Sequence, residues 1–185
     1  SFLLWATQGI LDVRGRAYAT LRTVPSGGAR HAFETYLIVQ HTKGLEPGAY
    51  HYLPMRHQLE FLHPVEDLPS AVTNSLMGQS WAAKASVIFY WSFVPYRCEW
   101  RYGIWAHRPA LIDAGHVGQN LYLACTALGL GTCAIAAFDT ALCDALFGLD
   151  GEEEFIVYTS AVGTISAANQ KLEKVFYQFV EDEGL

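Results

Sequence analysis

The sequence lacks three features that would each define a class of protein. Basic residues are few, 12 Lys and Arg against 18 Asp and Glu, and they form no stripe of the kind that binds nucleic acid. No apolar run is long enough to span a bilayer. We also expect no signal peptide, because residues 1–10 are apolar but lack a basic start and a cleavage site. We therefore expect neither nucleic acid nor a membrane as a partner.

Cysteine is scarce as well, and its spacing excludes the common frameworks. The four cysteines, Cys98, Cys125, Cys133 and Cys143, include no C-x-x-C pair. Three of them lie in apolar stretches, which favours small buried side chains in a reducing compartment over disulfides or a zinc site. We accordingly expect a cytoplasmic protein.

Histidine offers the other route to a metal site. His51, His57 and His63 fall on a predicted hairpin, where alternate side chains share one face. No carboxylate cluster joins them, so we expect them on a solvated face and predict no metal centre.

The composition is otherwise rich in apolar side chains. Hydrophobic residues make up 51% of the chain and aromatic residues 14%, whereas charged residues make up 16%. Such a composition suits a large buried area, a subunit interface or a flat aromatic ligand. A chain of 185 residues can bury a sizeable core, and we expect one domain over residues 1–185.

One stretch organises the predicted fold. Apolar side chains recur at steps of three and four over residues 111–128, which predicts a helix buried in the core or against a partner subunit. Gly115 and Gly118 would let another backbone approach this helix closely. Gly129 and Gly131 follow as an end signal, then an extended apolar run over residues 132–138, and Asp139 stands where the next helix needs its N-cap.

The remaining segments alternate between helical and extended patterns. We expect strands over residues 33–39, 85–94 and 154–162, and a hairpin built from residues 49–53 and 57–62. We expect helices over residues 1–9, 69–77 and 139–149, and a loop over residues 12–20. The first helix has no proper start, which suggests a missing N-terminal piece. Residues 171–184 form a charged segment with aromatic anchors that we expect to dock on another subunit.

Two stretches have chemical character. Residues 25–30, Pro-Ser-Gly-Gly-Ala-Arg, form a loop whose backbone N–H groups would cradle a phosphate or carbonyl, although a plain turn explains the same residues. Residues 96–108 hold a cluster of Tyr, Trp and Arg. It is either an amphipathic surface helix or the wall of a site, because Tyr handles protons and Arg holds anions. The cluster consists of Tyr96, Arg97, Trp100, Arg101, Tyr102, Trp105 and Arg108.

Several stretches of the chain coincide, in order, with the motifs of one family. They are residues 4–9 (LWATQG), 25–30 (PSGGAR), 48–52 (GAYHY), 101–103 (RYG), 113–120 (DAGHVGQN), 129–131 (GLG) and 134–139 (AIAAFD). With this set, which covers nearly the whole chain, the sequence resembles the FMN-dependent nitroreductase superfamily and, within it, the SagB-type dehydrogenases.

The resemblance implies an α+β fold in which helices flank a mixed, mainly antiparallel sheet, and a homodimer with FMN at its interface. It implies that the loop of residues 25–30 lies along the isoalloxazine and ribityl groups, and that the backbone after the Gly-Leu-Gly turn approaches the reducible flavin nitrogen. The cofactor-binding residues expected on this basis are Pro25, Ser26, Gly27, Gly28, Ala29, Arg30, Gly131, Ala136 and Ala137.

The phosphate ligands of FMN are less directly implied. The family's paired arginines lie on an N-terminal helix that this sequence does not contain. Arg22, Arg30 and Lys171 are the candidates here, the last because the family places a basic residue after the final strand.

The resemblance also implies two catalytic residues. In the family's azoline dehydrogenases a Lys-Tyr pair followed by Gly is implicated in proton removal, and this chain has Arg101, Tyr102 and Gly103. Tyr102 fits that role. Arg101 does not act as an ordinary base, since its proton does not leave near neutral pH. It would instead stabilise a tyrosinate or bind a carboxylate.

The sequence thus predicts an FMN-dependent oxidoreductase. It would dehydrogenate a peptide-derived or small organic substrate, or reduce nitro or quinone compounds with NAD(P)H. The alternative is a non-catalytic flavin-binding or scaffold member that partners another subunit. Three features favour it: the truncated start, Arg101 in place of the family's lysine, and Ala29 where the family often has a polar residue. A metal-dependent hydrolase is disfavoured because no ligand spacing recurs among the histidines.

Overall fold

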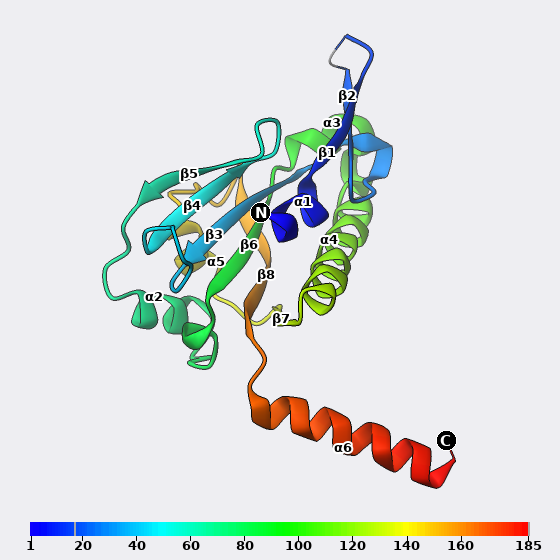
Figure 1. The fold of residues 1–185 in the computed structure, drawn as a ribbon. Helices are drawn as coiled ribbons and strands as arrows, with labels where there is room; N and C mark the ends of the chain where they lie inside the picture. Colours follow the sequence, from blue (N-terminus) through cyan, green and yellow to red (C-terminus); the bar gives the residue numbers. More distant parts are fainter. Residues whose placement is uncertain (17, 185) are drawn as a thin grey trace.

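A computed structural model describes residues 1–16 and 18–184, apart from the side chain of Glu173. Its centre is a six-stranded sheet in the order β5-β4-β3-β6-β8-β7, and every neighbouring pair is antiparallel (Figure 1). The predicted α+β class is confirmed. The strands are β3 (Phe33–Val39), β4 (Gly48–Leu53), β5 (Gln58–His63), β6 (Val87–Phe93), β7 (Leu130–Ile135) and β8 (Phe155–Thr164).

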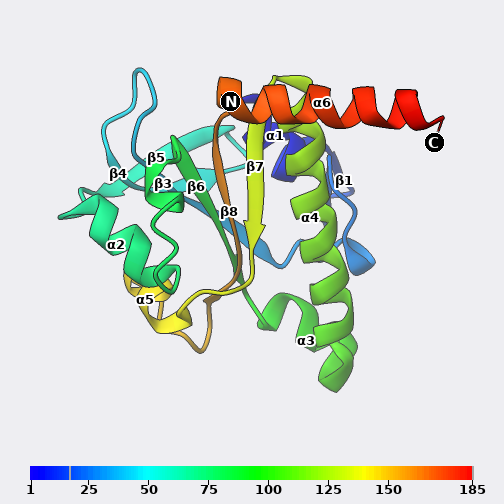
Figure 2. The same cartoon turned by 90° about the horizontal axis from the view of Figure 1, so that it is seen from below.

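Helices cover both faces of this sheet (Figures 1 and 2). One face packs against α1 and α4, and the other packs against α2 and α5. The helices are α1 (Phe2–Gln8), α2 (Leu68–Ser75), α3 (Tyr96–Tyr102), α4 (His107–Ala127), α5 (Thr140–Ala145) and α6 (Ala167–Glu183), with short 3₁₀ turns η1 (Gly27–Ala29), η2 (Ala82–Lys84) and η3 (Gly103–Trp105).

The two central strands explain why the sheet is buried on both sides. Successive residues of a strand point to opposite faces, so neighbours in β3 and β6 enter different cores. Leu37 and Phe89 join the core under α1 and α4, whereas Ile38 and Ile88 join the core under α2 and α5. The sequence predicted both segments as strands, and the almost continuous apolar run of residues 85–94 fits a strand buried on both faces.

Helix α4 is buried on one side only. Val117, Leu121 and Cys125 face the sheet, while Leu111 and Leu123 are exposed. The expectation that Gly118 admits another backbone is wrong. A Cβ at Gly118 would lie 2.7 Å from Cε1 of Tyr158, so the glycine makes room for an aromatic ring of β8.

Residues 12–20 are a second correction, because they do not form a loop. Strands β1 (Ile10–Arg14) and β2 (Ala19–Arg22) pair as a two-stranded antiparallel sheet. The hairpin projects from the body at the top of Figure 1. Strand β1 is mostly exposed and β2 is half-buried along its whole length, so the segment lacks the apolar alternation that marks a strand with one buried face.

Asp139 caps α5 as predicted, because its carboxylate accepts a hydrogen bond from the Leu142 amide at 3.0 Å. At the other end of the chain, α6 stands clear of the body (Figure 1), and Val180 is its only half-buried side chain among those described. No described helix is both long and apolar enough to cross a membrane.

Candidate functional site

The loop of residues 25–30 is fixed to α4 by a buried carboxylate. The Gly27 amide donates to both oxygens of Asp113, at 3.1 Å each. Asp113 is 4% exposed and lies on the face of α4 that points into the protein. A second bond closes the loop, since the His31 amide donates to Oγ of Ser26 at 2.9 Å. The loop is therefore a rigid turn, held at both ends.

Tyr102 and Arg101, at the end of α3, pack directly against this loop. Gly28 has a φ of +61°, and a Cβ there would lie 2.5 Å from Oη of Tyr102 and 3.0 Å from Nε of Arg101. Only a residue without a side chain fits that position. The structure thus brings the two residues expected to be catalytic to the loop expected to hold the flavin.

The start of α3 is tied to the centre of the sheet. Nη2 of Arg97 lies 2.6 Å from Oε1 of Glu34 on β3, and Nη1 of Arg97 donates to the carbonyl oxygen of His31 at 3.3 Å. Burial acts to raise the pKa of Glu34, but the hydrogen bond from His51 and the charge of Arg97 outweigh it and lower the pKa. Glu34 is therefore a carboxylate at neutral pH.

His51 corrects the expectation that no carboxylate joins the histidines. Its Nε2 lies 3.2 Å from Oε2 of Glu34, and its Nδ1 lies 3.9 Å from Glu60. The ring is half-buried and stacks on Tyr36 with centroids 4.6 Å apart. The other two histidines are exposed, as expected. Nowhere in residues 1–16 and 18–184 do three or more His, Cys, Asp or Glu side chains group to hold a metal ion.

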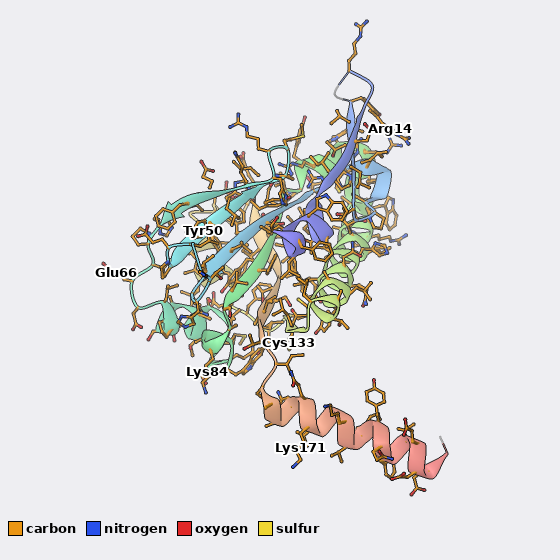
Figure 3. The ribbon with its side chains drawn as sticks, in the orientation of Figure 1. Arg14, Tyr50, Glu66, Lys84, Cys133 and Lys171 are labelled. Atoms are coloured by element: carbon orange, nitrogen blue, oxygen red, sulfur yellow. The ribbon has the colours of Figure 1, made fainter. Side chains whose placement is uncertain are left out.

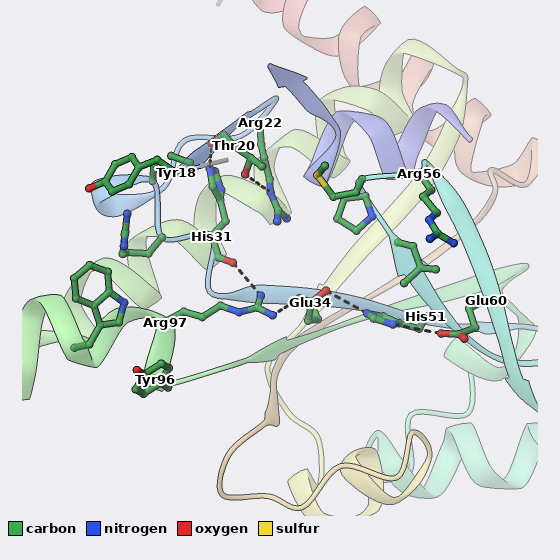
Figure 4. A pocket seen from close by; sticks show the side chains of 17 residues that line it. Tyr18, Thr20, Arg22, His31, Glu34, His51, Arg56, Glu60, Tyr96 and Arg97 are labelled. Atoms are coloured by element: carbon green, nitrogen blue, oxygen red, sulfur yellow. Dashed lines mark hydrogen bonds and ion pairs between the residues drawn. The ribbon is translucent and has the colours of Figure 1, made fainter. Parts of the chain in front are cut away.

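A cavity of about 770 Å³ opens between β2, the β4–β5 turn and α3 (Figure 4). This volume is within the usual range for ligand pockets, roughly 300–1,000 Å³. Ala29 and Arg30 belong both to the loop and to the cavity wall, so the two features adjoin. Arg22, Arg56 and Arg97 also line the cavity, together with the Glu34–His51–Glu60 group.

Arg22 and His31 are two further groups of this wall that are largely withdrawn from solvent. Nη1 of Arg22 donates to Oε1 of Gln8 at 2.7 Å, and burial lowers its pKa, although a guanidinium keeps its charge. Burial, and then the charge of Arg22, lower the pKa of His31 to about 4. His31 is neutral at pH 7, and its Nε2 lies 3.0 Å from the carbonyl oxygen of Thr20.

The other expected cofactor residues lie elsewhere. Ala136 and Ala137 follow β7 and are exposed, and in the described part of the chain their amides have no hydrogen-bond partner. Gly131 pairs with Gly163 in the sheet. In both views β7 lies on one side of α4 and the blue turn after β2, which contains η1, lies on the other (Figures 1 and 2). Lys171 is exposed on α6, away from the body (Figure 3).

Three supporting residues were given no role from the sequence, although two of them begin and end the motif of residues 113–120. Asp113 and Asn120 are polar residues on the apolar helix α4, and that contrast was a usable signal. Nδ2 of Asn120 donates to the carbonyl oxygens of Ala6 and Thr23, at 2.8 and 3.2 Å, which joins α4 to α1 and to the start of the loop. Glu34 lies on a strand, and no local sequence pattern indicates that His51 and Arg97 are its partners.

Comparisons with known proteins identify the family of the chain. The sequence model of the nitroreductase family matches residues 3–164. Over 138 residues the chain is 34% identical to MJ1384 of Methanocaldococcus jannaschii, a candidate nitroreductase, and the match covers 75% of this chain and 67% of that protein. Over 118 residues it is 30% identical to the trifolitoxin-processing protein TfxB of Rhizobium leguminosarum bv. trifolii, covering 59% of this chain and 30% of TfxB.

Solved structures show the same fold. A candidate nitroreductase from Anabaena variabilis superposes with a TM-score of 0.80 at 23% identity, over 87% of this chain and 33% of that one. A chain of the E. coli microcin synthetase McbBCD complex with truncated pro-MccB17 bound gives a TM-score of 0.74 at 22% identity, over 89% of this chain and 62% of that one. The chain thus spans about a third of the length of TfxB and of the Anabaena protein.

Proposed function

The chain belongs to the nitroreductase family, and from this membership and the geometry above we propose that it is an FMN-dependent oxidoreductase of the SagB type. The observation that carries the proposal is the packing of Tyr102 against Gly28, because it joins a phenolic hydroxyl to the loop that would support the flavin. Bound FMN would supply the redox chemistry, as the acceptor or donor of a hydride.

The residues present fit such a cofactor. The loop of residues 25–30 is rigid and carries no bulky side chain at Gly27 or Gly28, as a surface beside a flat ring requires. The exposed amides of Ala136 and Ala137 are free to donate to a ring heteroatom. Arg22 and Arg30 would hold the phosphate, together with Lys171, and Gly131, which has no side chain, would let the backbone that follows it come close to the ring.

Tyr102 is the group that would hold or move a proton. Its hydroxyl lies at the loop surface, within reach of a substrate placed over the ring. The guanidinium carbon of Arg101 lies 5.8 Å from the centroid of the Tyr102 ring, where it would help to position the phenol. Arg101 would therefore assist Tyr102 rather than act as the base.

A peptide-derived substrate is the substrate class that we propose. TfxB is named as a trifolitoxin-processing protein, and the McbBCD complex is named with truncated pro-MccB17 bound. Both names concern the modification of a peptide, and both fit the SagB-type subfamily. Reduction of nitro or quinone compounds by NAD(P)H is the competing activity, and NAD(P)H would then be the electron donor.

We further propose a homodimer with FMN at the interface. The loop of residues 25–30 and residues 136–137 lie on opposite sides of α4, so one flavin would touch both only if a second copy brought one of them (Figure 2). The exposed apolar residues of α4 and α6 provide the surface that such an assembly would cover. They are Leu111, Ile112, Leu123, Leu128, Leu172, Val175, Phe176 and Phe179.

The first experiment is the visible spectrum of the purified protein, with the released chromophore identified by mass. A flavin band with FMN released supports the proposal. A colourless protein that takes up no added FMN contradicts it. Rapid bleaching of the band by reduced nicotinamide would favour the reductase activity, and bleaching by a peptide substrate alone would favour dehydrogenation.

Replacement of one hydroxyl separates an enzyme from a scaffold. In Tyr102→Phe we expect flavin to be retained and turnover to fall by about 10²-fold or more, the usual contribution of a proton-transfer group. Tyr96→Phe, on the same helix but 76% exposed, is the matched control and should keep full turnover. Equal turnover in both variants would remove Tyr102 from the mechanism and favour a scaffold.

A further inference from the structure

Residues 134–139 lead from β7 to α5 and include two backbone amides without a hydrogen-bond acceptor. Ala136 and Ala137 are exposed, and no group in residues 1–16 and 18–184 accepts from their N–H groups. Figure 2 shows the chain leaving β7 and turning toward α5, beside α2. A stretch with unpaired amides is free to move unless its neighbours restrain it. Here the restraint comes from both sides of the stretch.

The end of α2 holds the far side of the segment. Nε2 of Gln79 donates to the carbonyl oxygen of Ala137 at 2.8 Å and to that of Leu76 at 2.9 Å. Both partners are acceptors, so the NH₂ group of the side chain faces them. The Asp139 amide donates to the carbonyl oxygen of Ser75, the last residue of α2, at 2.8 Å. Because a peptide group is planar, the bond from Gln79 fixes the orientation of the whole peptide unit that follows Ala137.

Tyr122 and Thr159 hold the near side of the segment. β7 is an edge strand of the sheet, so alternate amides have no neighbouring strand to pair with. The Ala134 amide donates instead to Oη of Tyr122 on α4, at 3.0 Å. Oγ1 of Thr159, a fully buried residue of β8, donates to the carbonyl oxygen of Ile135 at 3.1 Å. Residues 136 and 137 therefore lie between anchors on α4, β8 and α2, and their amides stay available to a ligand.

We propose that Gln79 and Tyr122 are positioning residues, which hold residues 134–139 so that the two free amides are presented together to an electron-rich ring. The identity of that ring as flavin rests on the proposed function. Donors that are already in place stabilise charge as it develops, whereas donors on a loose segment must first be ordered. A flavin gains electron density when it is reduced, so the held amides favour its reduced form. Neither side chain needs to touch the ring.

The test compares Gln79→Met with Gln40→Met in the flavin-loaded protein. Methionine is as long as glutamine but has no N–H group to donate. Gln40 is the matched control, because its Nε2 also donates to two carbonyl oxygens, those of Ala82 and Ala85, at 3.4 and 2.9 Å. In Gln79→Met we expect the ratio of reduced to oxidised flavin at a fixed potential to fall about tenfold, a shift of about 30 mV for two electrons. In Gln40→Met the free energy of unfolding should fall while the potential stays unchanged.

Two further measurements separate the anchors from each other and from the flavin. Tyr122→Phe removes the acceptor of the Ala134 amide at a side chain that is 38% exposed, and it should lower the potential in the same direction. In the flavin-free protein, the Asp139 amide should exchange with deuterium several times faster in Gln79→Met than in the wild type. The reason is that Ala137, two residues before it, is no longer held.

Several outcomes would overturn the assignment. An equal or raised potential in Gln79→Met, or equal shifts in Gln79→Met and Gln40→Met, would remove Gln79 from this role, and an unchanged potential in Tyr122→Phe would remove Tyr122. A protein that binds no FMN would contradict the proposed function. The exchange of the Asp139 amide would then still decide whether Gln79 holds the segment, since equal rates in wild type and variant would show that it does not.

Discussion

Nη2 of Arg97 lies 2.6 Å from Oε1 of Glu34, and this ion pair connects the helix that carries Tyr102 to a central strand of the sheet. Glu34 is largely buried, with a side chain that is 14% exposed, whereas Arg97 is 37% exposed. The pair thus acts through the position of α3, and neither residue needs to touch a substrate. Its strength should affect both stability and the placement of Tyr102.

Replacing Glu34 tests this connection. In Glu34→Gln, Arg97 and His51 lose their shared carboxylate, and we expect the free energy of unfolding to fall by about 1–3 kcal/mol, less than for a fully buried pair. Turnover should fall with little change in KM, because Tyr102 shifts while the binding surfaces remain. Glu60→Gln is the control, since its 3.9 Å contact with His51 is exposed and should cost little. Unchanged stability in Glu34→Gln would contradict the role of the pair.

Gly28 is predicted to matter for its contact with Tyr102 as well as for its backbone. In Gly28→Ala the positive φ costs about 1 kcal/mol, and the new Cβ, 2.5 Å from Oη of Tyr102, displaces that side chain. Gly44→Ala should be destabilised by a similar backbone strain at φ +84°, but its new Cβ would have no atom within 4 Å. We expect a similar loss of stability in both, measured by chemical denaturation, and a loss of turnover in Gly28→Ala alone.

The main elements of the fold were predictable because each carries a local signal. The apolar runs of β3, β6 and β8, the cap at Asp139 and the family motifs all act over short stretches of chain. The β1–β2 hairpin carries no such signal, since β1 is mostly exposed, β2 is half-buried along its whole length, and neither strand alternates between apolar and polar residues. The sequence also did not reveal that α4 is buried on one side only. Its exposed side carries apolar residues such as Leu111 and Leu123, so the sequence pattern is the same as that of a helix buried on all sides.

Acid should destabilise the protein through His31. Its pKa is lowered to about 4 in the folded protein and is near 6.5 when unfolded, so the unfolded state takes up a proton first. The stabilising contribution is complete above about pH 6.5 and is lost as the pH falls toward 4, by roughly 2 kcal/mol. His31→Gln, with an amide that still reaches the carbonyl of Thr20, should lose less stability than the wild type between pH 7 and 4.5. A parallel decline in both proteins would exclude His31 as the cause.

Two glycines of α4 should respond to alanine in opposite directions. Gly115 faces open space, so Gly115→Ala should raise the free energy of unfolding by about 0.5–1 kcal/mol through helix propensity. Gly118→Ala places a Cβ 2.7 Å from the ring of Tyr158 and should lower it by about 1–3 kcal/mol through overpacking. Thermal unfolding of both variants measures the difference, and equal shifts would mean that Tyr158 moves aside freely.

The candidate site was predictable only as far as its motifs extend along the chain. Residues 25–30 and Tyr102 were named from sequence, and the structure brings them into contact. The cavity wall depends on Glu34, Arg56 and Arg97, which come from three separate elements and share no spacing. Pairings across a sheet depend on register, and register is decided by the whole core rather than by any one segment.

The separation of α6 from the body has a thermodynamic consequence. A lone helix of this length is marginal in water, and α6 exposes Leu172, Phe176 and Phe179 without any cover from its own chain. If a second copy provides that cover, the free energy of association offsets the entropy lost when α6 becomes helical. Folding of the segment and assembly of the two copies then form one equilibrium. The helix content of dilute protein should then depend on its concentration, while the melting of the six-stranded body should not.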